Sequence, residues 1–286
     1  MKCTNNTLYA IVLALTVLSL TACSSKLQMP FDADSADSSV NITLTGSDSD
    51  IKPFAADICV TDNDFEEMSL AIDEAEAGGL FDATSAETVY AKNVHKKLNP
   101  ASLTKVMTAY IALEYGHLED TLTASSNVLI TESGAQLLGI KEGDKMTLEQ
   151  ALNALLLYSA NDAGVLIAEY LSGSVESFAS VMNDEAVKLG ATNTHFTNPH
   201  GLTDEEHYTT AYDLYLIFNA AMQHEEFRRI INTTEYKSTY KDREGNPKNI
   251  EISTTNAYLK GDVTAPDGVS VVGGKTGTTK AAKSCL

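Results

Sequence analysis

Hydrophobic positions recur every three or four residues through the middle of the chain. Positions with this spacing share one face of a helix, so the pattern predicts amphipathic helices. Glycines follow several of the predicted segments, and Thr147-Leu-Glu-Gln150 is a capping box that opens one of them. The predicted helices cover residues 102–115, 148–158, 163–171, 175–189 and 209–222.

Strand-like patterns lie on both sides of this helical region. The predicted strands are 77–81 and 88–91 around a turn at 82–85, 235–240 and 249–254 around a turn at 242–247, and a last strand entered through 269–274. An order of strands, then helices, then strands is typical of an α+β fold. It predicts a helical region inserted in, or packed on, an antiparallel sheet.

The N-terminal residues differ from the rest of the chain. The apolar run 8–20 is too short to span a membrane, but it follows a single basic residue, Lys2, as in a signal peptide. It ends in Leu20-Thr-Ala-Cys23, which resembles a bacterial lipobox, where the cysteine becomes the lipidated first residue of the mature chain. Residues 1–22 are therefore predicted to be a lipoprotein signal peptide. The alternative is an ordinary signal peptide cleaved near Ala22, with Cys23 incidental.

Serine and aspartate dominate the next segment. Residues 23–57 hold few large apolar groups, so they cannot bury enough surface to offset the entropy lost on ordering. We therefore predict that residues 23–57 form a flexible acidic tether, and that one folded domain follows over residues 58–286. No segment approaches the ~18 consecutive apolar residues of a membrane-spanning helix. We expect an exported protein, held by acyl chains on the outer face of the bacterial membrane.

Composition excludes several classes of protein. The chain has 286 residues, 43% of them hydrophobic and 21% charged, as in a globular protein. Its 39 acidic and 20 basic residues give a net charge of −19, which should repel nucleic acid. The four cysteines, at 3, 23, 59 and 285, form no C-x-x-C pair, which argues against a zinc ribbon or thioredoxin site. Cys59 and Cys285 either form a disulfide or stay as two separate buried thiols.

The first candidate motif, Pro100-Ala-Ser-Leu-Thr-Lys105, begins the first predicted helix. Three residues apart on a helix, Ser102 and Lys105 share one face. A lysine whose pKa is lowered by burial or by nearby cations can take the proton of a serine hydroxyl and so make it a nucleophile. The free N–H groups of a helix start favour negative charge on a substrate oxygen. Alone, this motif is a weak signal.

The second candidate motif, Ser159-Ala-Asn161, falls in the break between two predicted helices. A hydroxyl and an amide on such a loop can point into a cleft. Ser159 would relay a proton to a leaving amine, and Asn161 would orient Lys105 or a substrate amide. The alternative is that both side chains only cap the following helix.

The third candidate motif, Gly273-Gly-Lys-Thr-Gly-Thr278, is expected on an exposed strand edge. Gly277 would let a ligand approach the backbone, and the charge of Lys275 with the hydroxyls of Thr276 and Thr278 would suit a carboxylate. The Thr278 N–H would join that of Ser102 in an oxyanion hole. The spacing of a P-loop is absent, and the alternative is a plain glycine-rich turn.

In this order, the three motifs resemble those of penicillin-binding proteins and class A β-lactamases. From about residue 77 to 286, the sequence is similar to the low-molecular-mass penicillin-binding proteins that are serine-type D-Ala-D-Ala carboxypeptidases, the peptidase S11 family. The likeness is carried by Asn99-Pro-Ala-Ser-Leu-Thr-Lys105, Tyr158-Ser-Ala-Asn-Asp-Ala-Gly164, Thr197-Asn-Pro-His-Gly-Leu202 and Tyr208-Thr-Thr-Ala-Tyr-Asp-Leu214. It implies the β-lactamase/penicillin-binding-protein-like fold.

The resemblance also implies a mechanism on peptidoglycan stem peptides, with no metal and no organic cofactor. Ser102 attacks the carbonyl between the two terminal D-Ala residues, and β-lactam antibiotics acylate the same hydroxyl. The implied roles are proton acceptor for Lys105, proton relay for Ser159, orientation for Asn161, oxyanion N–H for Thr278, and substrate binding for Lys275, Thr276, Gly277 and Thr278. We interpret His200 and His207, in a loop bounded by proline and glycine, as structural.

Three alternatives stay open. A class A-like β-lactamase would need a glutamate general base in a motif resembling E-x-x-L-N, which is absent after Ser159, and Ala160 stands where such enzymes usually carry Asp. A transpeptidase would share every site residue and differ in its acceptor. A non-catalytic, truncated envelope lipoprotein is the third, because family members continue beyond the third motif whereas this chain ends at Leu286. We therefore expect the last sheet strands to be missing, as in a fragment of an active enzyme.

Overall fold

The structure is a computed structural model that describes residues 57–64 and 74–286. These residues belong to one compact unit, Lys52–Leu286. The predicted signal peptide (1–22), the predicted lipidation residue Cys23 and the predicted tether as far as residue 56 lie outside the described residues. Among the described helices, none combines the length and apolar character needed to cross a membrane.

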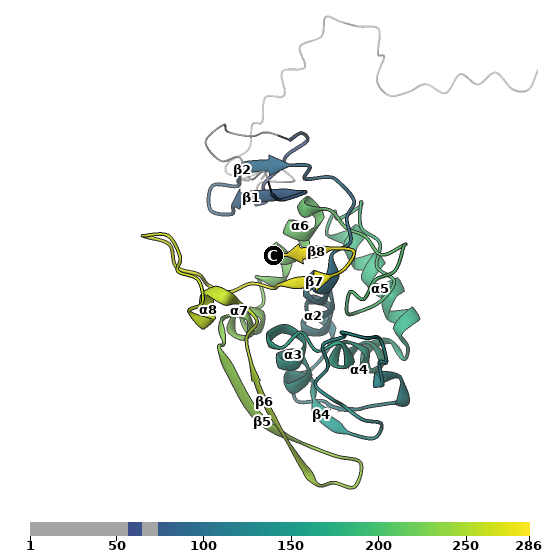
Figure 1. The fold of residues 1–286 in the computed structure, drawn as a ribbon. Coiled ribbons are helices and arrows are strands. Elements are labelled where there is room, and N and C mark those ends of the chain that lie inside the picture. Colours follow the sequence, from purple (N-terminus) through teal and green to yellow (C-terminus); the bar gives the residue numbers. More distant parts are fainter. Residues whose placement is uncertain (1–56, 65–73) are drawn as a thin grey trace, which may run out of the picture. The chain divides into compact units, whose positions relative to one another are not determined.

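Helices make up most of the regular secondary structure in the described unit (Figure 1). All five predicted helices are confirmed to within a few residues at each end. They are α2 (Thr104–Tyr115), α3 (Leu148–Leu157), α4 (Asn161–Ser172), α5 (Val175–Lys188) and α6 (Ala211–Ala221). The other helices are α7 (Glu225–Asn232), the single turn α8 (Ala257–Lys260), and the 3₁₀ turns η1 (Ala101–Leu103) and η2 (Ser126–Val128).

Local sequence signals set the ends of these helices. Thr147 and Gln150 form the predicted capping box at the start of α3, each side chain bonding the other residue's backbone N–H. Helix α2 stops at Gly116, and α4 stops at Gly173, whose left-handed conformation suits a residue without a Cβ. The turn between α3 and α4, where the second motif lies, is therefore bounded by two well-defined helices.

Helix α2 is embedded in the hydrophobic core. Helices α3, α4 and α6 pack against it. Its residues Val106, Met107 and Ile111 are at most 2% exposed, and full burial of such side chains stabilises a fold by roughly 1.5–3 kcal/mol each. Thr104 and Lys105, in the first turn, are also fully buried. The first motif therefore sits on a rigid part of the molecule.

The strands form three separate antiparallel sheets in the part that the structure describes. The first pairs β1 (Gly78–Asp82) with β2 (Glu87–Lys92), the second orders β3 (Thr121–Thr123), β4 (Lys145–Thr147), β5 (Glu235–Lys241) and β6 (Pro247–Ser253), and the third pairs β7 (Gly277–Thr279) with β8 (Lys283–Cys285). The long β5–β6 hairpin packs against α3, and its turn projects beyond the helices in Figure 1. Helices and antiparallel sheets together give the expected α+β fold.

Two sequence expectations need correction here. Residues 269–274 form no strand, because Gly273 adopts a φ of +151° and its backbone lies against Ile231 at the end of α7. The Asn232 side chain bonds the Val272 carbonyl there, so the segment docks on a helix instead of a ladder. The last hairpin begins only at Gly277. The possible disulfide is also not formed: Cys59 and Cys285 are free thiols, the first buried and the second half-buried.

Candidate active site

Ser102 and Lys105 meet as their spacing predicts. Ser102 lies in η1, which leads directly into α2, so its side chain comes one turn before that of Lys105. The Lys105 Nζ lies 2.9 Å from the Ser102 Oγ, and it donates to the Asn161 Oδ1 at 2.6 Å and to the His200 carbonyl at 2.5 Å. Three elements distant in sequence therefore converge on one buried amine.

The surroundings of Lys105 favour its neutral form. Burial lowers its pKa well below the usual value, and the positive charge of Lys275 lowers it further, while Asp162 has a smaller opposing effect. A neutral amine has two N–H groups, which the Asn161 and His200 carbonyl oxygens can occupy. Its lone pair is then left facing the Ser102 hydroxyl, which is the arrangement that a general base for serine requires.

The second motif contributes two side chains from the turn between α3 and α4. Ser159 has a φ of +64°, and Asn161 begins α4. Neither side chain caps this helix, whose N-cap is Ala160 without a side-chain hydrogen bond. Ser159 is 8% exposed and Asn161 4% exposed. The capping alternative is therefore wrong, and both polar groups face the buried lysines.

The third motif brings Lys275 beside Ser159. The Lys275 Nζ donates to the Ser159 Oγ at 3.0 Å and to the Thr276 carbonyl at 2.6 Å. Burial lowers the pKa of Lys275 to about 7. The Thr276 hydroxyl lies 2.8 Å from that of Thr255, a residue that sequence reasoning missed. A bound carboxylate would favour the protonated, charged form of Lys275, and it could accept hydrogen bonds from the neighbouring hydroxyl groups.

Gly277 explains how β7 approaches Ser102. A Cβ at this position would lie 3.0 Å from the Ser102 backbone nitrogen and 3.2 Å from the Ala101 Cβ. Only glycine lets the strand come this close without displacing η1. Thr278, the next residue of β7, is exposed. Its predicted oxyanion role stays a prediction, although its strand does lie against the Ser102 turn.

Of the two loop histidines, His207 is buried and His200 is half-buried, and neither ring has a hydrogen bond to Ser102 among those of the described residues. Burial lowers the pKa of His200 to about 3 and that of His207 to about 4, so both rings are neutral at neutral pH. The His200 Nδ1 accepts from the Leu202 N–H at 3.2 Å, and its carbonyl binds Lys105. This agrees with their interpretation as structural residues. The carbonyl of His200 is itself a site group that no side-chain pattern predicts.

Asp162 is a second group that sequence reasoning missed. Its carboxylate accepts backbone N–H groups from Leu138, Gly139 and Ile140 at 2.8–3.0 Å, and it is 1% exposed. It therefore fastens the loop before β4 to the second motif, directly beside Asn161. No motif in the sequence assigned a role to Asp162.

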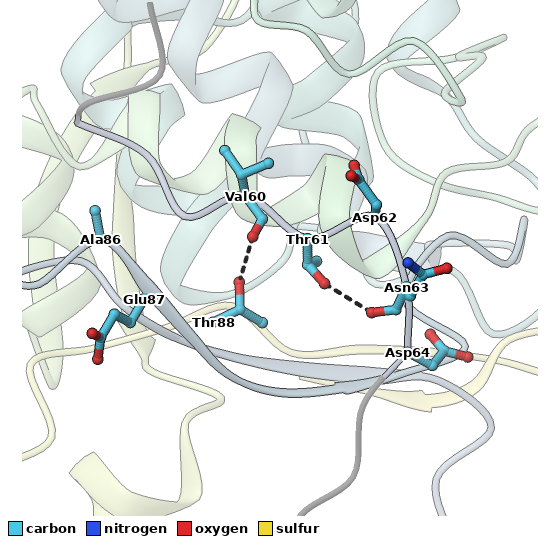
Figure 2. A pocket seen from close by; sticks show the side chains of 8 residues that line it. All are labelled: Val60, Thr61, Asp62, Asn63, Asp64, Ala86, Glu87 and Thr88. Carbon is cyan, nitrogen blue, oxygen red and sulfur yellow. Dashed lines mark hydrogen bonds between the residues drawn. The ribbon is translucent and has the colours of Figure 1, made fainter. Parts of the chain in front are cut away.

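A separate hollow lies away from these motifs. Figure 2 shows it between residues 60–64 and 86–88, with a volume of about 580 Å³. The Thr88 hydroxyl donates to the Val60 carbonyl at 3.4 Å across it. No predicted site residue lines this hollow. Among residues 57–64 and 74–286, no group of three or more His, Cys, Asp or Glu side chains is arranged to hold a metal ion.

Comparison with known proteins identifies the family that carries this arrangement. Residues 66–286 match the peptidase S11 family, described as D-alanyl-D-alanine carboxypeptidase. The chain belongs to this family. Its peptidase S11 relatives include the D-alanyl-D-alanine carboxypeptidases DacF of Bacillus subtilis, 34% identical over 74% of this chain, and DacC of Escherichia coli, 32% identical over 73%.

Solved structures agree with the assignment to peptidase S11. The Streptomyces K15 DD-transpeptidase superposes with a TM-score of 0.67 at 28% identity, covering 76% of this chain and 86% of that one. This likeness confirms the penicillin-binding-protein-like α+β fold. The chain spans about half the length of the curated relatives it matches, 53% of DacF and 51% of DacC.

Proposed function

We propose that this protein is a serine-type D-Ala-D-Ala carboxypeptidase that removes the terminal D-Ala from peptidoglycan stem peptides through an acyl-enzyme on Ser102. The observation that carries the proposal is the convergence on Lys105. Its Nζ lies 2.9 Å from the Ser102 Oγ and is oriented by two carbonyl oxygens, while the Ser159–Lys275 pair lies beside it. The names of the curated relatives describe this same activity.

The first step forms the acyl-enzyme. The Ser102 Oγ attacks the carbonyl carbon between the two D-Ala residues as its proton moves to the Lys105 Nζ. The substrate oxygen becomes negative and accepts hydrogen bonds from the backbone N–H groups of Ser102 and Thr278. Lys275 and Thr276 hold the terminal carboxylate, so the scissile bond is oriented before attack.

The second step releases D-Ala and restores the enzyme. The C–N bond breaks as the Ser159 hydroxyl donates a proton to the leaving amine, and Ser159 regains a proton from the neighbouring lysines. Water then attacks the ester, giving up a proton to Lys105, and the Ser102 oxygen leaves with a proton. The ring of a β-lactam opens at the first step, but its amine stays covalently joined to the acyl group. No fragment departs, so penicillin remains attached to Ser102.

A β-lactamase fits the site less well than a carboxypeptidase does. Every hydrogen bond of the Lys105 Nζ among the described residues goes to a hydroxyl or a carbonyl oxygen, and none goes to a carboxylate. The loop next to Lys105 presents the backbone carbonyls of Pro199 and His200 where a deacylating glutamate would be needed. Transfer to an amine, as the name of the Streptomyces K15 DD-transpeptidase describes, needs the same residues and a different acceptor.

The cellular location follows from the sequence of the N-terminus. Export through a signal peptide of residues 1–22, lipidation at Cys23 and an acidic tether as far as residue 57 would place the catalytic domain, 58–286, at the cell envelope. Peptidoglycan lies in that compartment. Radiolabelled palmitate incorporation by the wild-type chain, and its loss in Cys23→Ala, would test the lipid anchor.

The decisive experiment is the intact mass of the full chain after incubation with penicillin. We expect one penicillin per wild-type chain and none on Ser102→Ala. Ser126→Ala is a matched control, since Ser126 also lies in a 3₁₀ turn, η2, and should label like the wild type. A folded wild-type sample without an adduct would contradict the proposal.

Two further readouts separate the related activities. Persistence of the adduct for hours supports a penicillin-binding protein, whereas its loss within seconds would indicate a β-lactamase. A stem pentapeptide ending in D-Ala-D-Ala should lose one alanine, and the same peptide ending in L-Ala should not. Appearance of a product joined to an added amine, in place of the hydrolysed one, would reassign the protein as a transpeptidase.

A further inference from the structure

The residue before the nucleophile has an unfavourable backbone conformation. Ala101 has a φ of +48°, in the left-handed region that a side chain with a Cβ disfavours. Strain of this kind persists only where the surroundings hold it in place. The Ala101 conformation directs the chain into η1 and so determines where the N–H and the hydroxyl of Ser102 point.

Hydrogen bonds hold Ala101 at both of its polar groups. Its N–H donates to the Asn99 Oδ1 at 3.0 Å, and its carbonyl accepts from the Thr104 hydroxyl at 2.8 Å. The same hydroxyl lies 2.8 Å from the Nε2 of His207. Ala101 and Thr104 are fully buried and His207 is 1% exposed, so water does not compete for these bonds.

The direction of each bond in this series is determined by its partners. The Thr197 N–H can only donate, and it points at the His207 Nδ1 at 3.0 Å, so that nitrogen is unprotonated. Burial lowers the pKa of His207 to about 4, with Asp204 opposing and His195 and Lys105 adding to the shift, so the neutral ring carries its proton on Nε2. That N–H donates to Thr104, whose hydroxyl proton is then free for the Ala101 carbonyl.

The loop that includes His200 packs against Ala101 and Thr104 from the other side. A Cβ on Gly201 would lie 1.8 Å from the Ala101 carbonyl oxygen and 2.9 Å from the Thr104 hydroxyl, so the loop backbone rests directly on these groups. The Asn99 amide also donates to the His207 carbonyl at 3.4 Å. His207 is therefore tied to the residues on each side of Ala101. Both its ring nitrogens are occupied, so the ring is not an acid or base for substrate.

We propose that His207 is a positioning residue for the nucleophile: through the Thr104 hydroxyl it holds Ala101 in its left-handed conformation and so fixes the Oγ and N–H of Ser102. This inference rests on the proposed function, because the position of Ser102 matters only if Ser102 is acylated. It predicts that the series Thr197–His207–Thr104–Ala101 controls the rate of acylation and leaves the initial binding of the β-lactam nearly unchanged.

The test measures penicillin acylation of the full chain at saturating and subsaturating concentrations, which separates the acylation rate from initial binding. Thr104→Val removes the hydroxyl at nearly constant volume, and we expect it to lower the acylation rate by about 10²-fold, the effect of a small misplacement of a reacting group. Thr104→Ser restores the hydroxyl and should recover most of the rate. His207→Gln offers one donor and one acceptor on a longer side chain. Its acylation rate should fall between those of Thr104→Val and Thr104→Ser.

The matched control is His195→Gln. His195 lies in the same region and its ring bonds the Glu206 carbonyl, and none of its hydrogen bonds among the described residues goes to Thr197, His207, Thr104 or Ala101. It should acylate at the wild-type rate. Equal acylation rates for Thr104→Val and the wild type would overturn the inference. A wild-type chain that is not acylated at all would instead overturn the proposed function, and the positioning role with it.

A second measurement does not depend on activity or on the stability of any variant. Nitrogen-15 NMR of the imidazole rings in the wild-type chain should show His207 as a neutral ring protonated on Nε2 from pH 8 down to pH 5. A ring that exchanges between tautomers, or that titrates near its ordinary pKa, would overturn the inference even if Thr104→Val were slow.

Discussion

The two lysines of the site are equally buried but differently supported. Lys105 is fixed by side chains and a carbonyl from η1, α4 and the 197–202 loop, on a helix embedded in the core. Lys275 is held by Ser159 and by the carbonyl of its own neighbour, on a segment that becomes a three-residue strand only at Gly277. We call residues 101–105, which include Lys105, the nucleophile wall. We call residues 275–278, which include Lys275, the carboxylate wall.

The two lysines are held differently, and the difference matches two separate requirements of the proposed chemistry. Proton transfer from Ser102 needs a geometry held to a fraction of an ångström, and the nucleophile wall draws that rigidity from the core. Holding a carboxylate needs charge and N–H or O–H donors, which tolerate more movement, and the preceding segment of the carboxylate wall exposes Val269 and Val272 to solvent. Changes in the first wall should therefore affect the rate of bond formation, and changes in the second should affect mainly substrate recognition.

The largest effect is expected for Lys105→Met. This change keeps the length of the side chain and removes the proposed proton acceptor, so acylation should slow by about 10³-fold, within the range for loss of a general base. Stopped-flow acylation by a fluorescent penicillin gives the rate. Lys96→Met is the control, because Lys96 pairs with Glu76 on the surface. An acylation rate within threefold of the wild type would show that Lys105 is not the base.

Lys275→Met should reduce recognition of the substrate carboxylate. Loss of one charge-assisted contact of roughly 2–3 kcal/mol corresponds to about 30- to 150-fold in kcat/KM. A stem peptide with an amidated C-terminus distinguishes the two walls. The wild type should prefer the free carboxylate strongly, and Lys275→Met should treat both peptides alike. Retention of the preference in the variant would place carboxylate recognition elsewhere.

Gly277→Ala tests the contact between the two walls. The new Cβ would lie 3.0 Å from the Ser102 nitrogen, so β7 or η1 must move, and kcat/KM should fall by about tenfold. Gly274→Ala is the matched control, since its Cβ would meet only the Asn256 amide, at 3.5 Å. If the two variants show equal activity, the close approach of β7 to Ser102 has no consequence for catalysis.

The last expected effect is on stability in acid. The pKa of His200 and that of His207 fall from 6.5 to about 3 and about 4, so the unfolded chain binds protons that the native chain does not. This stabilisation is complete above pH 6.5 and is lost as the pH falls towards 4, by roughly 1–3 kcal/mol per ring.

Thermal melts between pH 8 and 4 measure this loss. His207→Gln should flatten the profile, whereas His195→Gln, at a half-buried position in the same region, should not. Because both histidines support the nucleophile wall, acylation should decline together with the melting temperature. Identical profiles for His207→Gln and the wild type would contradict the assignment of a neutral buried ring.

Local signals allowed most of the helical part to be predicted from the sequence. The capping box at Thr147 and the glycines at 116 and 173 act within one turn, so they can be read without knowing the fold. Strands β3 and β4 have three residues each and are too short to show a period. Residues 269–274 have a strand-like composition, but docking on α7 decides their conformation.

The candidate site was predictable in its side chains and not in its backbone groups. Ser102 and Lys105 follow from spacing on one helix, and their resemblance to a family placed Ser159 and Lys275 beside them. The carbonyl of His200 reaches Lys105 across 95 residues of sequence, and the Thr104–His207 bond spans 103. Such contacts exist only in the folded chain, where any residue type could have supplied the carbonyl.

The three oxygen atoms around the Lys105 Nζ equal in number the N–H groups of an ammonium ion. In the proposed acylation the amine takes the proton of Ser102; the new N–H then points at the oxygen that has just lost it, and the other two N–H groups keep their partners. Proton uptake therefore requires no rotation of the side chain and little rearrangement of the neighbouring dipoles. The reorganisation that water would need at this step was completed when the chain folded.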